Sequence, residues 1–458
     1  MSPISRSRIP FLLVLSGCAA DFGDPGGDEI GQESAEIAVC GTSIQSAIDD
    51  APAGSVLVMC PGTYSGPLAI SGKSLTLRGR EGADSTIIDA GDDGPALVVA
   101  NTPSPGVTVR GLTLRNGRNA GAGGGVRCTQ SRLVINASVI ASNVADGGGG
   151  LYASFCALTV TGTLFQNNDG NSRSGGGAWV VDSSGAIDSS RFLGNQAELG
   201  GGVAIVEGTL VLRDSEIRDN VGAVRGGGLY HSSNAAVLRT TIADNSSNWI
   251  AGGVYVFRHA PTIRASTIRG NTSVNDGGGL YIHQSRVRLL ENTIAANLAQ
   301  DDGGGVRVFE SESRLEGNLI QNNQAGDGGG GVRLSHLQSV LIGNVVRNNS
   351  SGNIGRGIQP LQLAPASTDR RAGAHVGSAG RVSADQQSLP RGQHRAGPEG
   401  LRRGARDKGS AYPLVVGTHV AVAGLRLDNL QVPLHALHRP AGWRPAQPVS
   451  EPARAPDP

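Results

Sequence analysis

Residues 276–284 read DGGGLYIHQ, three glycines followed by residues that alternate between apolar and polar. Similar glycine runs return along the chain at intervals of 25 to 27 residues. The last glycines of these runs are Gly125, Gly150, Gly177, Gly202, Gly228, Gly253, Gly279, Gly305, Gly331 and Gly357. A regular period of this length, with short apolar runs and no helical periodicity, indicates a solenoid in which each repeat forms one coil.

A second column of residues keeps step with the glycines. It consists of the asparagines Asn143, Asn168, Asn195, Asn220, Asn245, Asn271, Asn297, Asn323 and Asn349. Five residues before each asparagine lies a small polar residue, namely Ser138, Thr163, Ser190, Ser215, Thr240, Ser266, Asn292, Asn318 and Asn344. Strands of successive coils pair in parallel about 4.8 Å apart, so an inward asparagine can hydrogen-bond to the asparagine of the next coil. The column therefore predicts a buried structural ladder.

Several short motifs carry a family resemblance. "GGGLY", "GGGV" and the spacing in "FQNN", "FLGN" and "IAAN" resemble the right-handed parallel β-helix repeats of pectin-lyase-like proteins, particularly the GGA(I/L/V) and FxxN repeats of polymorphic outer membrane proteins. Upstream, "SIQSAIDDAPAGSVLVMCPGTYSG" resembles the capping helix and first coils of that superfamily, with Ile44, Ala47 and Ile48 on the apolar face of the helix. The resemblance spans residues 40–358; it is specific for fold and weak for function.

We therefore predict an all-β chain, a single-stranded right-handed parallel β-helix with an N-terminal capping helix. Residues 40–358 would form about 12 coils, roughly 60 Å long at the spacing of paired strands. The composition agrees with a repetitive fold, because the chain holds 70 glycines and only 7 Phe, 6 Tyr and 3 Trp. The net charge of +1 gives no indication of nucleic acid as a partner.

The first residues resemble an export signal. Arg6 and Arg8 precede the apolar run "IPFLLVL", and "LSGC" resembles a bacterial lipobox in which Cys18 receives a lipid. This predicts a lipoprotein signal over residues 1–17, an acidic tether over residues 18–39, and an outer-membrane or cell-surface protein held to the membrane by a lipid anchor only. A plain cleaved signal peptide is the alternative. We expect a monomer.

Four further cysteines, Cys40, Cys60, Cys128 and Cys156, are expected to form disulfides in an exported chain. Proximity in the sequence favours Cys40 with Cys60 and Cys128 with Cys156, although four cysteines allow three pairings. A zinc site is a poorer interpretation because the chain has no CxxC motif.

The repeat stops after Gly357. Residues 359–458 form a basic segment rich in proline, arginine and glycine, with a single asparagine, Asn429. Two hypotheses fit this composition: a disordered tail, or the product of a frameshift in GC-rich coding DNA. The second would be wrong if no other reading frame restores the glycine and asparagine columns.

The second residue after each glycine run offers a candidate ligand surface. The residue directly after the run is apolar, so period-two alternation predicts that the second residue faces outward. This outward column contains Arg127, Tyr152, Trp179, Ala204, Tyr230, Tyr255, Tyr281, Arg307 and Arg333. Aromatic rings can stack on sugar faces and arginine can fork onto uronate carboxylates, which predicts a polysaccharide or extracellular matrix ligand. The alternative is that the aromatics stack on one another for stability alone.

Evidence for chemistry in the sequence is weak. Related β-helix enzymes use acidic clusters, often with calcium, or a basic residue acting on uronates, but their GHG, RIK and DPH signatures are absent here. The candidate catalytic residues are Asp182, Glu207 and Arg258, which share one position in their coils. Asp146, Asp276, Asp302 and Asp327 each open a glycine run and could bind calcium, although turn chemistry explains them more simply. His231, His259, His283 and His336 form no column, so we predict no metal or other cofactor.

The leading prediction is therefore a non-enzymatic surface protein that binds polysaccharide along the outward column. One alternative is a polysaccharide lyase or glycoside hydrolase of the pectin-lyase-like superfamily, and another is a structural or adhesive protein with a protein partner.

Overall fold

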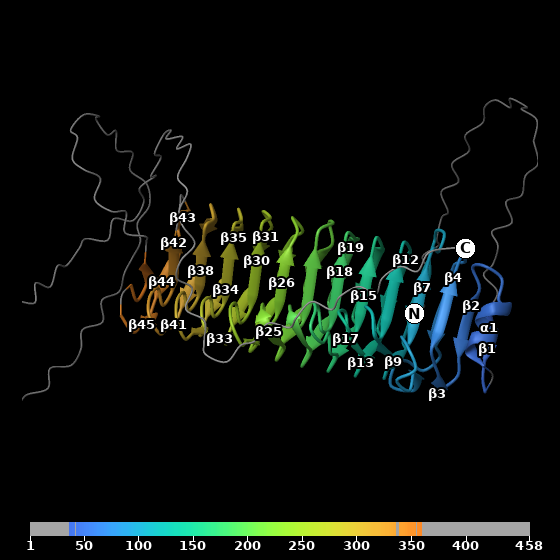
Figure 1. Ribbon diagram of the computed structural model, residues 1–458. Helices are drawn as coiled ribbons and strands as arrows, with labels where there is room; N and C mark the ends of the chain where they lie inside the picture. Colours follow the sequence, from blue (N-terminus) through green and yellow to red (C-terminus); the bar gives the residue numbers. More distant parts are fainter. Residues whose placement is uncertain (1–35, 42, 336–338, 354, 360–458) are drawn as a thin grey trace, which may run out of the picture. The chain divides into compact units, whose positions relative to one another are not determined.

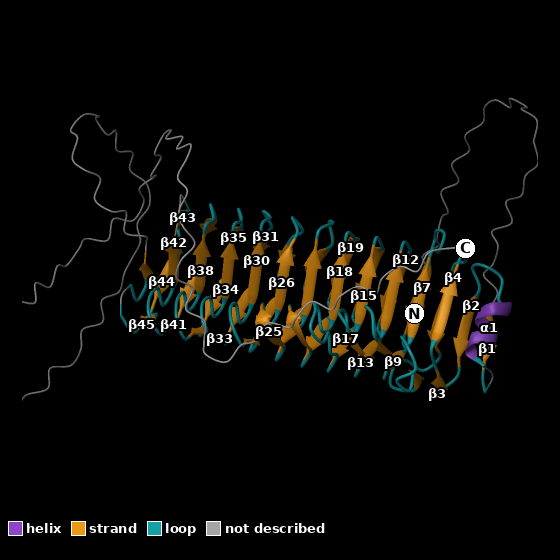
Figure 2. Cartoon of the chain, in the orientation of Figure 1, coloured by secondary structure: helices purple, strands orange, loops and turns teal. Residues whose placement is uncertain are grey.

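The computed structural model describes residues 36–41, 43–335, 339–353 and 355–359. Cys18, His336, most of the predicted tether and residues 360–458 lie outside the described residues. In the part of the chain that is described, strands stack into long parallel sheets (Figure 1). The described residues form a right-handed parallel β-helix with one short helix, α1 (Ile44–Asp50), at its N-terminal end (Figure 2).

Four sheets run along the β-helix. Sheet A contains β1 (Glu36–Val39), β2 (Val56–Met59), β5 (Leu75–Gly79), β8 (Val107–Arg110), β12 (Arg132–Asn136), β16 (Ala157–Thr161), β19 (Ser184–Asp188), β23 (Val211–Arg213), β27 (Val237–Leu238), β31 (Thr262–Arg264), β35 (Arg288–Leu290), β39 (Arg314–Glu316) and β43 (Val340–Ile342). Sheet B contains β3 (Gly62–Ser65), β6 (Thr86–Asp89), β9 (Thr113–Arg115), β13 (Val139–Ala141), β17 (Leu164–Gln166), β20 (Arg191–Leu193), β24 (Glu216–Arg218), β28 (Thr241–Ala243), β32 (Thr267–Arg269), β36 (Thr293–Ala295), β40 (Leu319–Gln321) and β44 (Val345–Arg347).

The strands that follow the glycine runs form sheet C. They are β4 (Leu68–Ser71), β7 (Leu97–Ala100), β11 (Val126–Thr129), β15 (Leu151–Ser154), β18 (Ala178–Val181), β22 (Val203–Val206), β26 (Leu229–Ser232), β30 (Val254–Phe257), β34 (Leu280–His283), β38 (Val306–Phe309), β42 (Val332–Ser335) and β46 (Ile358–Gln359). Sheet D contains β21 (Gln196–Leu199), β25 (Val221–Arg225), β29 (Ser246–Ser247), β33 (Thr272–Ser273), β37 (Leu298–Ala299), β41 (Gln324–Ala325) and β45 (Ser350–Ser351), and β10 (Arg118–Asn119) pairs separately with β14 (Val144–Ala145).

Each coil visits the sheets in the order C, A and B, and the coils from β18 onward add a strand of sheet D. One coil, for example, runs through β34, β35, β36 and β37 before the next glycine run begins. The pairing is in register: Tyr255 of β30 lies opposite Tyr281 of β34, and Tyr281 lies opposite Arg307 of β38. Residues one period apart in the sequence are therefore neighbours in space, as predicted.

The β-helix begins earlier than predicted. Strand β1 pairs in parallel with β2, with Glu36 opposite Val56 and Val39 opposite Met59. Residues 36–39 therefore belong to the first coil rather than to the tether, because their alternation leaves Val39 almost fully buried against the core. Helix α1 covers this end through the buried residues Ile44 and Ile48, as the amphipathic pattern indicated.

The asparagine column forms the predicted ladder. Asn220 is fully buried, and its side-chain oxygen accepts hydrogen bonds from the backbone and side-chain nitrogens of Asn195 at 2.9 and 3.0 Å. Its own amide nitrogen donates to Asn245 Oδ1 and to the Phe192 carbonyl, both at 2.9 Å. The small polar column forms a second ladder, in which the Ser190 nitrogen donates to Ser215 Oγ at 3.1 Å. Both ladders satisfy buried turn backbone from coil to coil.

The glycine runs serve two steric purposes. The first glycine in several runs, such as Gly277 at φ 69°, takes a left-handed conformation that side chains disfavour. The last glycine permits close stacking: a Cβ on Gly279 would lie 2.5 Å from the Gly305 carbonyl oxygen. Alanine at the last position would therefore force adjacent coils apart.

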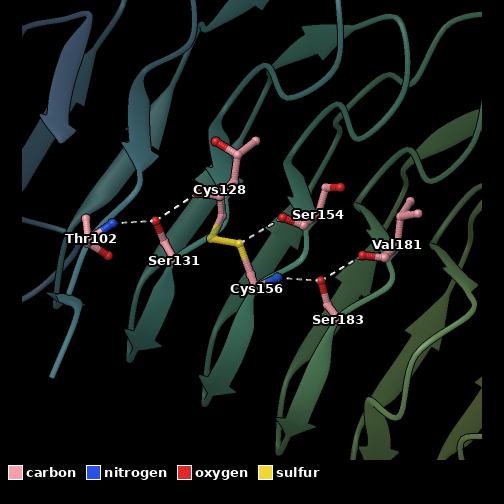
Figure 3. The surroundings of a disulfide bond; sticks show 8 residues. Thr102, Cys128, Ser131, Ser154, Cys156, Val181 and Ser183 are labelled. Atoms are coloured by element: carbon pink, nitrogen blue, oxygen red, sulfur yellow. Dashed lines mark hydrogen bonds between the residues drawn. A yellow bond between two sulfur atoms is a disulfide. The ribbon is translucent and has the colours of Figure 1, made fainter. Parts of the chain in front are cut away.

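Two disulfides lie within the coils, between Cys40 and Cys60 and between Cys128 and Cys156. They join the pairs that are closest in the sequence. Figure 3 shows Cys128 and Cys156 on adjacent coils, with Ser183 Oγ accepting a hydrogen bond from the Cys156 nitrogen at 3.0 Å. Ser183 and Ser131 thus continue the pattern of hydroxyl groups that bind turn backbone beside this disulfide.

Candidate functional site

The outward column lies on the outer face of sheet C, but its residues differ in exposure. Arg127 is exposed, while Tyr152, Trp179, Tyr230 and Arg333 are half-buried. By contrast Tyr255, Tyr281 and Arg307 are only 2, 8 and 6 % exposed. For these three residues the prediction of an open surface is wrong, although their direction relative to the main core is as expected.

The buried residues Tyr255, Tyr281 and Arg307 are covered by the turns that lead into their strands. Ala251 is buried together with Tyr255 and Tyr281 in a small apolar cluster outside the main core, and Ile250 packs against it. The turn at Gly277 comes so close that a Cβ there would lie 2.8 Å from Tyr281 Cβ. The rings of Tyr230, Tyr255 and Tyr281 also stack, with centroids 5.5 and 5.7 Å apart. Ring stacking for stability therefore applies to this part of the column.

Burial also controls the chemistry of these tyrosines. It raises the pKa of the Tyr255 phenol to about 12 and raises the pKa of Tyr281 as well. Tyr255 Oη lies 3.1 Å from His283 Nδ1, so the phenol keeps a hydrogen-bond partner although it is cut off from water. Both phenols therefore remain neutral at physiological pH.

The four aspartates considered for calcium all contact arginines. Arg173 Nε lies 2.8 Å from Asp146, Arg307 Nε lies 3.3 Å from Asp276, and Arg333 contacts both Asp302 and Asp327. Burial raises the pKa of Asp302 to about 6 and also raises the pKa of Asp276. Carboxylate oxygens of Asp276, Asp301 and Asp302 lie within 4.8 Å of one another. The guanidinium groups of Arg307 and Arg333 already provide positive charge at this cluster, so ion pairing accounts for it.

Two other arginines on this side have no acidic partner among the described residues. The Arg225 guanidinium carbon lies 5.5 Å from the centre of the Tyr255 ring and 5.7 Å from that of Trp249. The Arg258 guanidinium carbon lies 4.7 Å from the centre of the Phe257 ring. Each cation thus rests on an aromatic face instead of pairing with a carboxylate.

The candidate catalytic residues share one corner of the β-helix. Asp182, Glu207 and Arg258 directly follow sheet C strands and have φ of 45, 55 and 61°. The corner column also contains Gln284 and Glu310, which have φ of 50 and 47°. Glu207 contacts His259 Nε2 at 3.3 Å, whereas no described interaction joins Asp182 to Glu207. Asp182 lies beside Glu207 in the adjacent coil, with its backbone nitrogen 3.0 Å from the Val206 carbonyl oxygen, whereas Arg258 lies two coils further along.

A pocket of about 470 Å³ lies beside this corner column. The charged and polar side chains that line it include Arg258, His259, Gln284, Arg286, Glu310 and Glu312. Gln284 Nε2 donates to Glu310 at 3.0 Å, and Arg286 Nε lies 3.3 Å from Glu312. The pocket is thus strongly polar and contains groups of both charges.

Sequence reasoning missed several residues of this face. Phe257, His283 and Phe309 occupy the fourth position after the glycine run, which period-two alternation also directs outward. Extending the outward column from the second to the fourth residue after each glycine run would have found them. Arg225 and Trp249 lie in the segments between the asparagine and the glycine run, where the repeat is least regular, and no pattern points to them.

Comparisons with known proteins agree with the fold. The family model for the right handed beta helix region matches residues 124–285, and no curated protein matches the sequence. Among solved structures, an A-module of a mannuronan C-5 epimerase from Azotobacter vinelandii is 17% identical, with 71% of this chain and 95% of that chain covered and a TM-score of 0.48.

Two further solved structures are similar. A mannuronic acid specific polysaccharide family 6 lyase from human gut microbiota is 13% identical, with 71% and 83% covered and a TM-score of 0.35. The catalytic unit of an alpha-1,3-glucanase from Streptomyces thermodiastaticus is 16% identical, with 71% and 70% covered and a TM-score of 0.36. These similarities concern the fold alone. In the described residues, no helix is long and apolar enough to span a membrane.

Proposed function

We propose that this protein binds polysaccharide along the outer face of sheet C, through the members of the outward column that remain accessible. The observation that carries the proposal is the partial exposure of Tyr152, Trp179 and Tyr230 on one continuous sheet face, with the exposed Arg127 nearby. Rings that are fixed by packing on one side and open on the other lose little entropy when a sugar stacks on them. Regular spacing along the sheet suits a polymer rather than a single small molecule.

The buried part of the column has a supporting role in this proposal. Tyr255, Tyr281 and Arg307 cannot touch a ligand without movement of the turns that cover them. Tyr255 instead supports Tyr230, whose ring stacks on it at 5.5 Å between centroids. The proposed contact residues are therefore Arg127, Tyr152, Trp179, Tyr230 and Arg333.

A glycan array tests the proposal with the full-length protein. The double variant Tyr152→Ala, Trp179→Ala should lose at least about tenfold in apparent affinity for the glycans that the wild type binds, because stacking surface worth about 1 kcal/mol or more is removed at each ring. Val221→Ala is a matched control, because Val221 is an exposed apolar residue of β25 in sheet D. Circular dichroism should show that all variants are folded.

Two outcomes would contradict this function. If the double variant binds glycans as well as the wild type, the outer face of sheet C is not the ligand surface. If the wild type binds no glycan at all, a structural or adhesive protein with a protein partner becomes the better hypothesis.

A polysaccharide lyase or hydrolase is a second candidate, and one observation favours it. Tyr255 Oη, His283 and Glu310 form a chain of titratable groups, with 3.1 Å between Tyr255 Oη and His283 Nδ1 and 3.7 Å between His283 Nε2 and Glu310. Such a chain beside the unpaired Arg225 and Arg258 could move a proton and bind a carboxylate. Release of unsaturated or reducing sugar from uronate polymers, lost in His283→Gln, would establish the enzyme.

We also propose export, followed by lipid attachment at Cys18. Two disulfides support an oxidising compartment, because cytosolic proteins rarely keep such bonds. The lipobox resemblance supports the anchor, which would hold the β-helix at the outer membrane or cell surface.

A further inference from the structure

The pocket beside the corner column contains charged groups that pair within the protein and two that do not. Arg286 is paired with Glu312 at 3.3 Å, and His259 Nε2 lies 3.3 Å from Glu207. Arg286 and Glu312 therefore neutralise each other on the pocket wall. Arg258 and Glu310 are the exceptions.

Arg258 has no carboxylate partner among the described residues. Its guanidinium carbon lies 4.7 Å from the centre of the Phe257 ring, and its side chain is exposed in the pocket. An aromatic face orients a guanidinium group but does not neutralise it. The outward edge of the group therefore keeps hydrogen-bond donors for a carboxylate.

Glu310 has no arginine or lysine partner among the described residues. It accepts a hydrogen bond from Gln284 Nε2 at 3.0 Å and lies 3.7 Å from His283 Nε2. Burial lowers the pKa of His283, so this imidazole is neutral near pH 7 and leaves the carboxylate charge uncompensated. Glu310 can therefore accept a cation from solution.

The corner geometry fixes the spacing of the two backbone positions that carry these charges. Arg258, Gln284 and Glu310 follow β30, β34 and β38, which are successive neighbours in sheet C. Their backbones are therefore about 5 Å apart from coil to coil and about 10 Å apart across the pair. Gln284 lies between them in the column and donates a hydrogen bond to Glu310. Arg258 and Glu310 both line the same pocket and do not pair with each other.

We propose that this pocket is a binding site for a small zwitterionic group, whose carboxylate pairs with Arg258 and whose ammonium pairs with Glu310. An amino acid, a short peptide or an amino-sugar acid would supply this shared chemistry. The site lies at the corner rather than on the tyrosine column, so it does not depend on the polysaccharide function proposed above. Binding of a mixed-charge group would use both uncompensated charges at once.

Isothermal titration calorimetry on the full-length protein tests the site with three matched probes. 6-Aminohexanoate carries both charges, hexanoate carries only the carboxylate, and hexylamine carries only the ammonium. The zwitterion should bind at least about tenfold more tightly than either singly charged probe, because two charge-assisted contacts form instead of one. Glycine and glycylglycine then distinguish a free amino acid from a peptide as the source of the group.

Variants at exposed positions keep the test independent of folding. The single variants Arg258→Gln and Glu310→Gln should each reduce the affinity for the zwitterion at least about tenfold. The double variant Arg258→Glu, Glu310→Arg should restore that affinity, with the zwitterion bound in the opposite orientation. Arg264→Gln is the control, because Arg264 lies outside the pocket and pairs with Glu291. Equal binding of hexanoate or hexylamine would show a simple ion site and overturn the proposal. Absence of any binding at millimolar concentration would overturn it too.

Discussion

His231 is a fully buried titratable residue whose charge state affects the stability of this protein. It occupies an inward position of β26, between Ile205 and Val256 of the adjacent coils, and it is fully buried. Its Nε2 lies 3.0 Å from the Ala235 carbonyl oxygen, which fixes the proton on that nitrogen, and Nδ1 has no hydrogen-bond partner among the residues that the structure describes. Burial lowers the pKa of His231 to about 4.

This depressed pKa predicts acid sensitivity. A histidine whose folded-state pKa lies below its unfolded value of 6.5 contributes stability above pH 6.5, and that contribution disappears as the pH falls towards 4. The free energy of unfolding should therefore fall by up to about 3 kcal/mol from this residue alone. Urea unfolding at pH 7.5 and pH 4.5 measures the difference, which His231→Val should largely remove.

A second histidine provides the control for this prediction. His259→Gln should keep the wild-type difference between the two pH values, because it retains His231. Asp302 acts in the opposite direction: its pKa is raised to about 6, so its contribution is lost as the pH rises through that value. An acid sensitivity that persists unchanged in His231→Val would show that other groups cause it.

The tyrosines show how far single residues could be predicted from sequence. Period-two alternation places Tyr255 and Tyr281 on the outer side of sheet C, and the structure agrees. Their burial could not be predicted, because it depends on packing against Ile250, Ala251 and the turn at Gly277, which the alternation along the strand does not indicate. The pairing of Cys128 with Cys156, by contrast, was favoured by their proximity in the sequence, and the structure agrees.

At the scale of elements, the asparagine ladder joins all the coils from Asn143 to Asn349. Each internal asparagine both accepts from the coil before it and donates to the coil after it, as Asn220 does. The ladder was predictable because it demands the same residue in every coil. The register between strands is then set by hydrogen bonds between identical asparagine side chains in adjacent coils.

Position in the ladder should determine the cost of removing an asparagine. Asn220→Ala leaves the Asn195 nitrogens and the Phe192 carbonyl without partners inside the core, which should cost about 3 kcal/mol or more. Asn349→Ala at the last coil should cost about 1 to 2 kcal/mol, because Asn349 is 8 % exposed and water can replace it.

The midpoint of urea unfolding compares these two variants. Thr241→Ala provides a control from the outer side of β28, where no buried partner depends on the side chain. Equal destabilisation by Asn220→Ala and Asn349→Ala would mean that the ladder does not act through burial of its neighbours.

At the scale of the whole molecule, the two ends of the β-helix differ. Helix α1 covers the first coil, whereas the inward residues Leu341 and Val346 near the other end of the described β-helix are only half-buried. The covered end is the one that follows the predicted tether. A lipid on Cys18 would therefore hold the protein by its capped end.

Metabolic labelling checks this anchor. In a bacterium that processes lipoproteins, a labelled fatty acid should appear on the wild-type protein and not on Cys18→Ser, which has no thiol to accept it. The wild type should also fractionate with membranes. Labelling of Cys18→Ser, or an unlabelled soluble wild type, would favour the plain signal peptide instead.

The left-handed corner after sheet C has a consequence for how this chain can change. Its side chains point away from the core and recur at one fixed pitch, so the fold places few demands on their identity. Natural or engineered substitutions can thus change the order of positive, negative and neutral side chains along this corner while the β-helix stays the same.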